Sequence, residues 1–331
     1  MRIAVDAMGG DYAPPEIVAG CIDVLRSGLS CKIILIGYPD VLKVEIRRHR
    51  GDTFPIEIEP CTSIIDMGES PIPALRRKPD SSIMVAYRMI KRKKADCVVS
   101  AGNTGASFIA GVTILGRLKG IERPAIAAPI PTKNGFCILL DVGANVDCKP
   151  NQLFQFGIMG KVYAEEVFGI ENPRIGILNI GEEEGKGNRL TDRTFSLFSN
   201  SKLNFCGNIE GGDILKGKAD VIVCDGFVGN SLLKFGEGVS EFIIDYVKNG
   251  NMMSKIGLLF LKSLFKSLYK KIDYSEYGGA PLLGINGISI ICHGRSKRKA
   301  IANAIKAALS SVSHNIARKI EEDIIKVSDR H

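Results

Sequence analysis

The stretch DCVVSAGNTGA, residues 96–106, decides the fold of this chain. A short apolar run at 97–99 is followed by a glycine-rich polar turn, and an apolar segment with spaced glycines continues over 107–118. This order predicts a strand, a tight turn and a helix. The first N–H groups of such a helix have no acceptor within the helix and carry partial positive charge, so an anion can bind there. The residues assigned to this anion site are Ser100, Gly102, Asn103, Thr104 and Gly105. A capped turn that binds nothing explains the same stretch equally well.

Short apolar runs alternate with longer amphipathic segments on both sides of this stretch. Because strands and helices alternate, the sequence predicts an α/β fold with a mostly parallel sheet covered by helices. The predicted strands cover 2–8, 32–37, 56–59, 97–99, 125–129, 136–141, 174–179, 203–209, 219–224 and 287–292. The main predicted helices cover 15–25, 83–94, 152–168 and 297–327.

The composition limits the classes of protein and of partner. The 331 residues are 45% hydrophobic, which suffices for the core of one large domain or of two lobes. A net charge of +8 favours acidic partners, whereas the lack of Trp argues against a surface that stacks nucleic-acid bases. Scattered cysteines without a CxxC pair indicate reduced thiols and give no sign of a metal site. No apolar run approaches the roughly 20 residues of a membrane span, and Asp6 comes too early for a secretory signal, so we expect a cytoplasmic protein.

Most of the predicted strands end in a short turn of Gly, Asn, Asp or Lys. Ligands of α/β sheets bind beyond the carboxyl ends of the strands, so we expect these turns to form one polar crevice. The turn at 179–188 differs from the phosphate loop of nucleotide hydrolases, because its glycine spacing is too short and its three glutamates would repel a triphosphate. His293 either acts as an acid or base or makes a structural hydrogen bond. The other residues assigned to the crevice are Asp6, Gly9, Gly10, Asp11, Asp141, Gly143, Asn145, Asn188, Asp225 and Gly226.

Two basic segments are candidates for contact with acidic partners. The proline-rich segment 66–82 carries Arg76, Arg77 and Lys78, which predicts a basic loop that either docks an acidic protein or is simply solvated. Residues 252–271 place apolar side chains on one face of a helix and lysines on the other. Such a helix either lies on an anionic bilayer or packs on the core or on a second subunit. The residues assigned to membrane contact are Leu258, Leu261, Leu264, Phe265 and Leu268.

Six motifs that span nearly the whole chain resemble, in order, those of the PlsX family of phosphate acyltransferases. They are VDAMGGD (5–11), SAGNTGA (100–106), DVGANVDCKP (141–150), NIGEE with KGN (179–188), DGFVGN (225–230) and EYGGAPLLG (276–284). The last motif adds Gly278 and Gly279 to the predicted site. The resemblance implies an enzyme that makes acyl phosphate from inorganic phosphate and an acyl thioester of acyl carrier protein, for bacterial phospholipid synthesis and with no cofactor.

The same resemblance implies a homodimer that attaches peripherally to the membrane. It also implies a three-layer α/β/α fold similar to phosphotransacetylases and to isocitrate and isopropylmalate dehydrogenases. We therefore expect a single domain over 1–331 with a helical excursion at about 236–275. Positive charge at Arg76 to Lys78 would suit docking of the acidic carrier protein.

Motif matching to the family makes Lys186 and Asn230 the expected catalytic pair. Phosphate is itself a nucleophile and thiolate a reasonable leaving group, so the site must supply position and charge stabilisation. Members of the family often carry Arg where this chain has Gly212, and Lys186 is the best candidate to supply that cation. The alternatives are a phosphotransacetylase-like enzyme that uses coenzyme A thioesters, a nicotinamide-dependent decarboxylating enzyme and a membrane-bound adaptor without activity.

Overall fold

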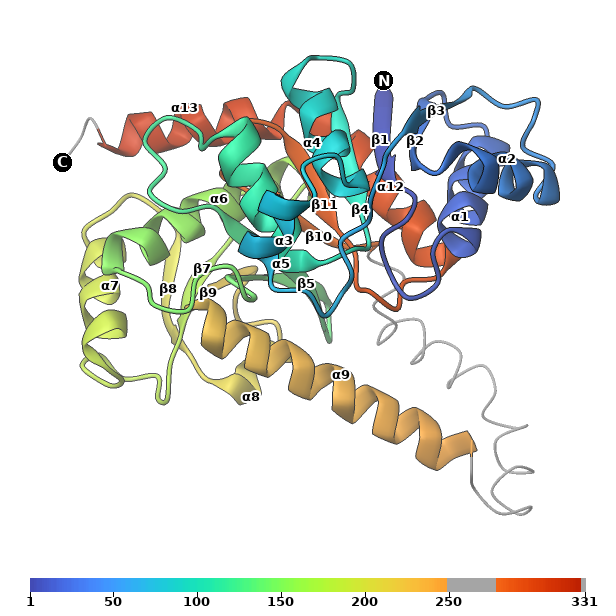
Figure 1. Cartoon of the computed structure of the whole chain (residues 1–331). Helices are drawn as coiled ribbons and strands as arrows, with labels where there is room; N and C mark the ends of the chain where they lie inside the picture. Colours follow the sequence, from blue (N-terminus) through green and yellow to red (C-terminus); the bar gives the residue numbers. More distant parts are fainter. Residues whose placement is uncertain (249–277, 329–331) are drawn as a thin grey trace.

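The structure, a computed structural model, describes residues 1–248 and 278–328. In these residues one 11-stranded sheet lies between helices on its two faces (Figure 1). This arrangement confirms the predicted α/β/α fold. The strands, in sheet order, are β3 (Ile56–Pro60), β2 (Lys32–Gly37), β1 (Arg2–Asp6), β4 (Cys97–Ser100), β11 (Ile288–Ile291), β10 (Ala280–Leu283), β5 (Ala125–Thr132), β6 (Gly135–Leu140), β9 (Val221–Val223), β7 (Ile175–Leu178) and β8 (Phe205–Ile209). The helices are α1 (Pro15–Arg26), α2 (Pro39–Arg48), α3 (Pro71–Arg77), α4 (Ser82–Lys91), α5 (Thr104–Ala110), the π-helical turn η1 (Gly111–Leu115), α6 (Pro150–Phe168), α7 (Arg189–Ser199), α8 (Gly211–Ile214), α9 (Gly226–Lys248), α12 (Arg298–Ser313) and α13 (Ile316–Ser328).

Alternation along the strands explains why both faces of the sheet are covered. Ile3 and Val5 on β1 pack into a core with α1 and α12, whereas Ala4 points into the opposite core beneath α4. A third core lies under α6 and α13, where Phe156 and Ile320 are buried. Because successive side chains of a strand point to opposite faces, a central strand that is apolar at every position needs helices on both sides.

The sheet contains two parallel sets of strands that run in opposite directions. β1, β2, β3, β4 and β11 form one set, and β6, β7, β8 and β9 form the other. Between them lie β10 and β5, each antiparallel to both of its neighbours. On one side of β10, Ala280 pairs with Ile291, the last residue of β11. On the other side, Leu282 pairs with Ile126 of β5. The next residue of β5, Ala127, pairs with Leu140, the last residue of β6. This stagger brings the carboxyl ends of both sets to nearly the same level of the sheet.

Three segments differ from the expectation drawn from the sequence. The predicted loop at 66–82 contains α3, because Pro71 stands in the first helical turn, where proline fits. The single helix predicted for 297–327 is two helices, because Asn315 takes a left-handed conformation (φ 53°) after α12. Strand β10, which joins the two parallel sets, is not among the strands predicted from the sequence.

Helix α9 extends away from the sheet along one side of the molecule (Figure 1). It covers the start of the predicted helical excursion and is described as far as Lys248. The residues assigned to membrane contact, at 258–268, lie outside the described residues. Among the helices of residues 1–248 and 278–328, none is long and apolar enough to span a bilayer.

Candidate active site at the strand ends

The carboxyl ends of β1 and β4 form the first group of predicted site residues. Asp6 and Ser100 are partners in the parallel pairing of these strands. The Ser100 hydroxyl donates to Oδ2 of Asp6 at 2.8 Å and accepts the N–H of Gly102 at 3.1 Å. Burial raises the pKa of the Asp6 carboxyl, although hydrogen bonds from Ser82 and Ser100 oppose this shift. The buried carboxyl therefore fixes the glycine-rich turn through one intervening serine.

Glycines at these turns allow a close approach of backbone segments. A methyl group on Gly9 would lie 2.5 Å from Oδ2 of Asp6 and 2.8 Å from the Cα of Gly102, so no other residue fits there without a shift. The N–H of Asp11 donates to the carbonyl of Gly294 at 2.8 Å, which ties the turn after β1 to the turn after β11. Gly10, next to these contacts, has a φ of 106°, which favours glycine.

The side chain of Asn103 holds the loop at 66–69 in place. Its Oδ1 accepts the N–H of Ala106 at 3.0 Å, which caps α5. Its Nδ2 donates to the carbonyls of Asp66, Met67 and Glu69 at 2.9–3.2 Å. In this structure Asn103 therefore holds the loop at 66–69 against the start of α5. Thr104 beside it is exposed.

Other predicted residues lie around this first group. Gly105 contacts α3, because a methyl group there would lie 2.5 Å from Cγ of Pro71. Gly278 lies against α12 and Gly279 against β11. The exposed His293 accepts the N–H of Arg295 on its Nδ1 at 3.1 Å, so a structural bond is present at this histidine.

The carboxyl ends of β6 and β9 form the second group, which is centred on Asp141. Its Oδ1 accepts the N–H of Ile126 at 2.9 Å, and its Oδ2 accepts the N–H of Asn145 at 2.6 Å and the Asn145 side-chain amide at 3.0 Å. The carbonyl of Asn145 in turn accepts the N–H of Gly226 at 2.7 Å. Burial raises the pKa of Asp141 to about 6 despite these hydrogen bonds. Asp141 thus holds the backbone of Ile126 and Asn145 in place.

Asp141 makes the stability of the protein depend on pH. Its folded pKa of about 6 exceeds the ordinary 3.8, so the folded state binds the proton more tightly than the unfolded chain. Its contribution to the free energy of unfolding is complete below pH 4 and is lost as the pH rises through 6, by about 3 kcal/mol in all.

We therefore expect the stability difference between wild type and Asp141→Asn to shrink as the pH rises from about 4 to 6. The variant should remain the less stable of the two, because its new amide group faces the donors of Asn145. Urea unfolding of both proteins at several pH values measures this difference. If the difference in the free energy of unfolding is the same at every pH, the raised pKa of Asp141 is contradicted.

Asn230 stands beside the Asp141 turn at the start of α9. The side-chain Oδ1 of Asp225 accepts the N–H of Val228 at 2.9 Å, so Asp225 caps this helix. A methyl group on Gly229 would lie 2.0 Å from the carbonyl oxygen of Asp141, which shows how closely the first turn of α9 approaches β6. A methyl group on Gly143 would lie 3.5 Å from the Asn230 side chain. The glycines thus let Asn230 lie directly against the turn at 141–145.

Lys186 lies on the loop that follows β7. Its backbone carbonyl accepts the side-chain amide of Asn179 at 2.8 Å, and Gly187 takes a φ of 101° directly after it. Asn188 ends the loop by capping α7, with its Oδ1 accepting the N–H groups of Leu190 and Thr191. The Lys186 side chain itself is exposed, and no ion pair of Lys186 occurs within residues 1–248 and 278–328. The loop thus fixes the backbone of this lysine while its ammonium group stays accessible.

The predicted residues therefore form two groups, one on each parallel set, with β10 and β5 between them in the sheet. Helix α9 links the groups, because its first turn packs on β6 while Glu241 pairs with Arg295, two residues after His293, at 2.7 Å.

The predicted docking cations lie at the end of α3. Arg76 is exposed, but Lys78 pairs with Glu69 and donates to the carbonyl of Ile64, so part of this positive charge is neutralised.

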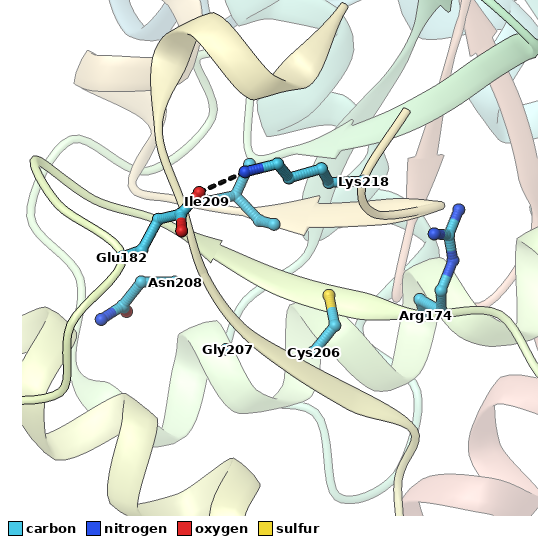
Figure 2. A pocket seen from close by; sticks show the side chains of 7 residues that line it. All are labelled: Arg174, Glu182, Cys206, Gly207, Asn208, Ile209 and Lys218. Atoms are coloured by element: carbon cyan, nitrogen blue, oxygen red, sulfur yellow. Dashed lines mark hydrogen bonds and ion pairs between the residues drawn. The ribbon is translucent and has the colours of Figure 1, made fainter. Parts of the chain in front are cut away.

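Sequence reasoning missed the residues that support the Lys186 loop from its other side. Lys218 pairs with Glu182 of this loop and with the buried Asp213. Lys218 and Glu182 line a cavity of about 340 Å³ at the edge of the sheet (Figure 2). The residues that form this cavity are Arg174, Glu182, Cys206, Gly207, Asn208, Ile209 and Lys218. Glycines before Asp213 indicate a turn in the sequence, but no local pattern relates Lys218 to Glu182, which lies 36 residues earlier.

Comparison with known proteins places the whole chain in one family. A family model described as a fatty acid synthesis protein matches residues 1–319. A phosphate acyltransferase of Dictyoglomus turgidum is 49% identical over 335 residues, covering 100% of this chain and 99% of that protein. The phosphotransacetylase of Streptococcus pyogenes superposes with a TM-score of 0.61 at 16% identity and covers 94% of both chains. The 4-hydroxythreonine-4-phosphate dehydrogenase of Klebsiella pneumoniae reaches a TM-score of 0.50 at 12% identity, covering 96% of this chain and 99% of that one. At these identities the two structures show a shared fold.

Proposed function

This chain belongs to the phosphate acyltransferase family, PlsX, and we propose that it transfers the acyl group of an acyl carrier protein thioester to inorganic phosphate. As a member of this family it is an acyltransferase of fatty acid synthesis, and we propose that its product serves phospholipid synthesis. The observation that carries the proposal is the Lys186 loop, which holds the backbone of the lysine through Asn179 and leaves its ammonium group exposed. A cation presented in this way suits a phosphate nucleophile and the negative charge that develops on a thioester oxygen.

The proposed reaction is a direct acyl transfer. A phosphate oxygen attacks the thioester carbonyl carbon, the tetrahedral intermediate collapses, the C–S bond breaks, and the carrier leaves as its thiolate. The N–H groups at 103–105 together with the Thr104 side chain hold the phosphate, because the N–H groups of Gly102 and Ala106 already donate to Ser100 and Asn103. Lys186 neutralises the charge of the phosphate, and Asn230 donates a hydrogen bond to the carbonyl oxygen. The buried Asp6 and Asp141 hold the two turns in place and do not transfer protons. No side chain is acylated in this scheme.

Apolar side chains beside the second group support an acyl substrate. Val146, Ile180 and Phe227 follow the ends of three adjacent strands, β6, β7 and β9, and are 60%, 81% and 65% exposed. Val146 and Phe227 lie next to Asn145 and Gly226, whose backbones are hydrogen-bonded at 2.7 Å. Exposed large apolar residues that gather at one place usually mark a binding surface. We assign this surface to the acyl chain, whose thioester end would then reach Asn230.

The identity of the donor is tested by comparing two substrates. Purified protein should release the thiol of long-chain acyl carrier protein only when phosphate is present, and should form acyl phosphate in equal amount. Acyl coenzyme A with the same chain should be the poorer donor by kcat/KM. Equal or better use of acyl coenzyme A would favour a phosphotransacetylase-like enzyme, and no phosphate-dependent release from either donor would favour a non-enzymatic adaptor.

We also propose that the chain acts as a single-domain homodimer attached peripherally to anionic membranes in the cytoplasm. Phe235, Val239, Phe242 and Tyr246 are exposed at helical spacing on α9, which gives this helix an apolar stripe that a second copy can cover. The amphipathic pattern of 252–271, outside the described residues, supports the membrane contact. The exposed Arg76 and Arg77 on α3 remain the proposed contact for the acidic carrier. Light scattering tests the dimer, and flotation with anionic vesicles tests the membrane contact.

A further inference from the structure

The loop that carries Lys186 is held by an ion pair at Glu182, four residues before the lysine. The ammonium of Lys218 pairs with the carboxylate of Glu182, and Figure 2 shows this pair among the residues that line the cavity. The same ammonium lies 2.7 Å from Oδ2 of Asp213. Asp213 is only 3% exposed, so its position is set by the protein around it. Lys218 therefore connects a fixed carboxylate to the loop.

A second contact joins this support to Lys186 itself. The buried Asn208 donates its side-chain amide to the carbonyl of Glu183 at 3.0 Å. The same carbonyl accepts the N–H of Lys186 at 3.3 Å. A displacement of residues 182–183 would consequently move the backbone of Lys186, which is held on its other side by Asn179.

The composition of the loop explains why it needs this support. Gly181, Gly185 and Gly187 interrupt it, and the last two take positive φ values of 81° and 101°. Glycines give the unfolded loop many conformations, and three successive glutamates at 182–184 repel one another. Glu182 itself is exposed and lines the cavity. The ion pair to Lys218 thus takes the place of packing.

We propose that Lys218, backed by Asp213, is a positioning residue that holds the Glu182 segment so that Lys186 stays aligned for acyl transfer. This inference rests on the role proposed for Lys186 and adds to it a residue that does not touch the substrate. Misplacement of a catalytic group by about 1 Å lowers rates by up to about 100-fold, so a charge pair remote from the substrate can control kcat.

The test compares Lys218→Met with Lys216→Met. Lys216 pairs with the same Asp213 at 2.8 Å but makes no ion pair with the loop in the described residues, so it is a matched control. Lys218→Met should lower kcat about 10-fold or more and speed amide hydrogen exchange at 180–187. Lys216→Met should change neither quantity by more than about twofold, and Lys218→Arg should restore most of the activity. Glu182→Gln, which removes the other partner, should reproduce the effect of Lys218→Met.

Unchanged exchange at 180–187 in Lys218→Met, or faster exchange with a normal kcat, would overturn the positioning role. If Lys218→Met does not fold, Glu182→Gln decides the question by the same two measurements. Hydrogen exchange separates this inference from the proposed function. Should Lys186→Ala keep full activity, the catalytic role of Lys186 fails, while the exchange data still report whether Lys218 fixes the loop.

Discussion

Replacement of Lys186 by alanine is expected to lower the rate of acyl-phosphate formation by about 1,000-fold or more. Lys186 is the exposed cation of a loop whose backbone is fixed by Asn179, and its charge is proposed to meet both the phosphate and the developing oxyanion. Because the side chain is exposed and makes no ion pair in the described residues, its removal should leave the melting temperature nearly unchanged. Steady-state kinetics with long-chain acyl carrier protein and phosphate, together with thermal unfolding, measure both quantities.

An exposed lysine on the same half of the sheet provides the control for this variant. Lys202→Ala removes the same charge from the surface and should keep wild-type kinetics. Activity of Lys186→Ala within a few-fold of normal would remove this residue from the mechanism. A crystal grown in phosphate that places Thr104, Lys186 and Asn230 around different ions, or none, would contradict the proposed site as a whole.

Replacement of Asn230 by alanine is expected to lower kcat by about 100-fold to 1,000-fold, the usual effect of removing one donor to an oxyanion. Asn230 lies against the turn at 141–145, which Asp141 holds through three hydrogen bonds, so its amide is well placed to stay fixed during the reaction. The KM for phosphate should change little, since the amide acts on the thioester oxygen.

A second substitution at this position shows whether Asn230 donates a hydrogen bond or only fills space. Asn230→Asp keeps the size of the side chain but replaces the donor by a carboxylate oxygen, so it should be at least as slow as Asn230→Ala. A slow Asn230→Ala combined with a fast Asn230→Asp would show that Asn230 fills space and does not donate. Circular dichroism of both variants establishes that α9 and the sheet are intact.

The sequence predicted the order of the elements well because most strands are short apolar runs with glycine or polar turns after them. The turns that carry Asp6, Ser100, Asp141 and Asn145 were identified correctly as strand ends, and the structure shows their side chains bonding to neighbouring backbone. Asp6 and Ser100 are the last residues of β1 and β4, and Asp141 follows β6 directly. A polar residue at the end of a buried strand thus predicted a turn anchored there.

Strand β10 shows why the remaining part of the fold was missed. Its four residues follow two glycines and include Pro281, a pattern that indicates a turn and argues against a central strand. Only pairing with both β11 and β5 makes the segment a strand, and such long-range pairing leaves no local periodicity. Without β10 the two parallel sets could not be recognised as running in opposite directions.

Roles of individual side chains were predicted less well than their positions. The sequence did not reveal that the amide of Asn103 donates to the loop at 66–69. Lys218 was missed because its partner Glu182 is distant in sequence and comes close only through the pairing of β7 with β8 and β9. Local patterns report which residues end a strand, whereas the partner of a side chain depends on the tertiary structure.

The place of β11 between β4 and β10 has a consequence for biosynthesis. The first hundred residues leave the ribosome long before their sheet has its last strand, and the exposed edge of β4 stays unpaired until residues 288–291 emerge. Helix α12, which follows immediately, then covers α1 and closes the N-terminal core. Domains usually fold in the order in which they are synthesised; here the earliest segment must wait for the latest, and the nascent chain carries an open edge for most of translation.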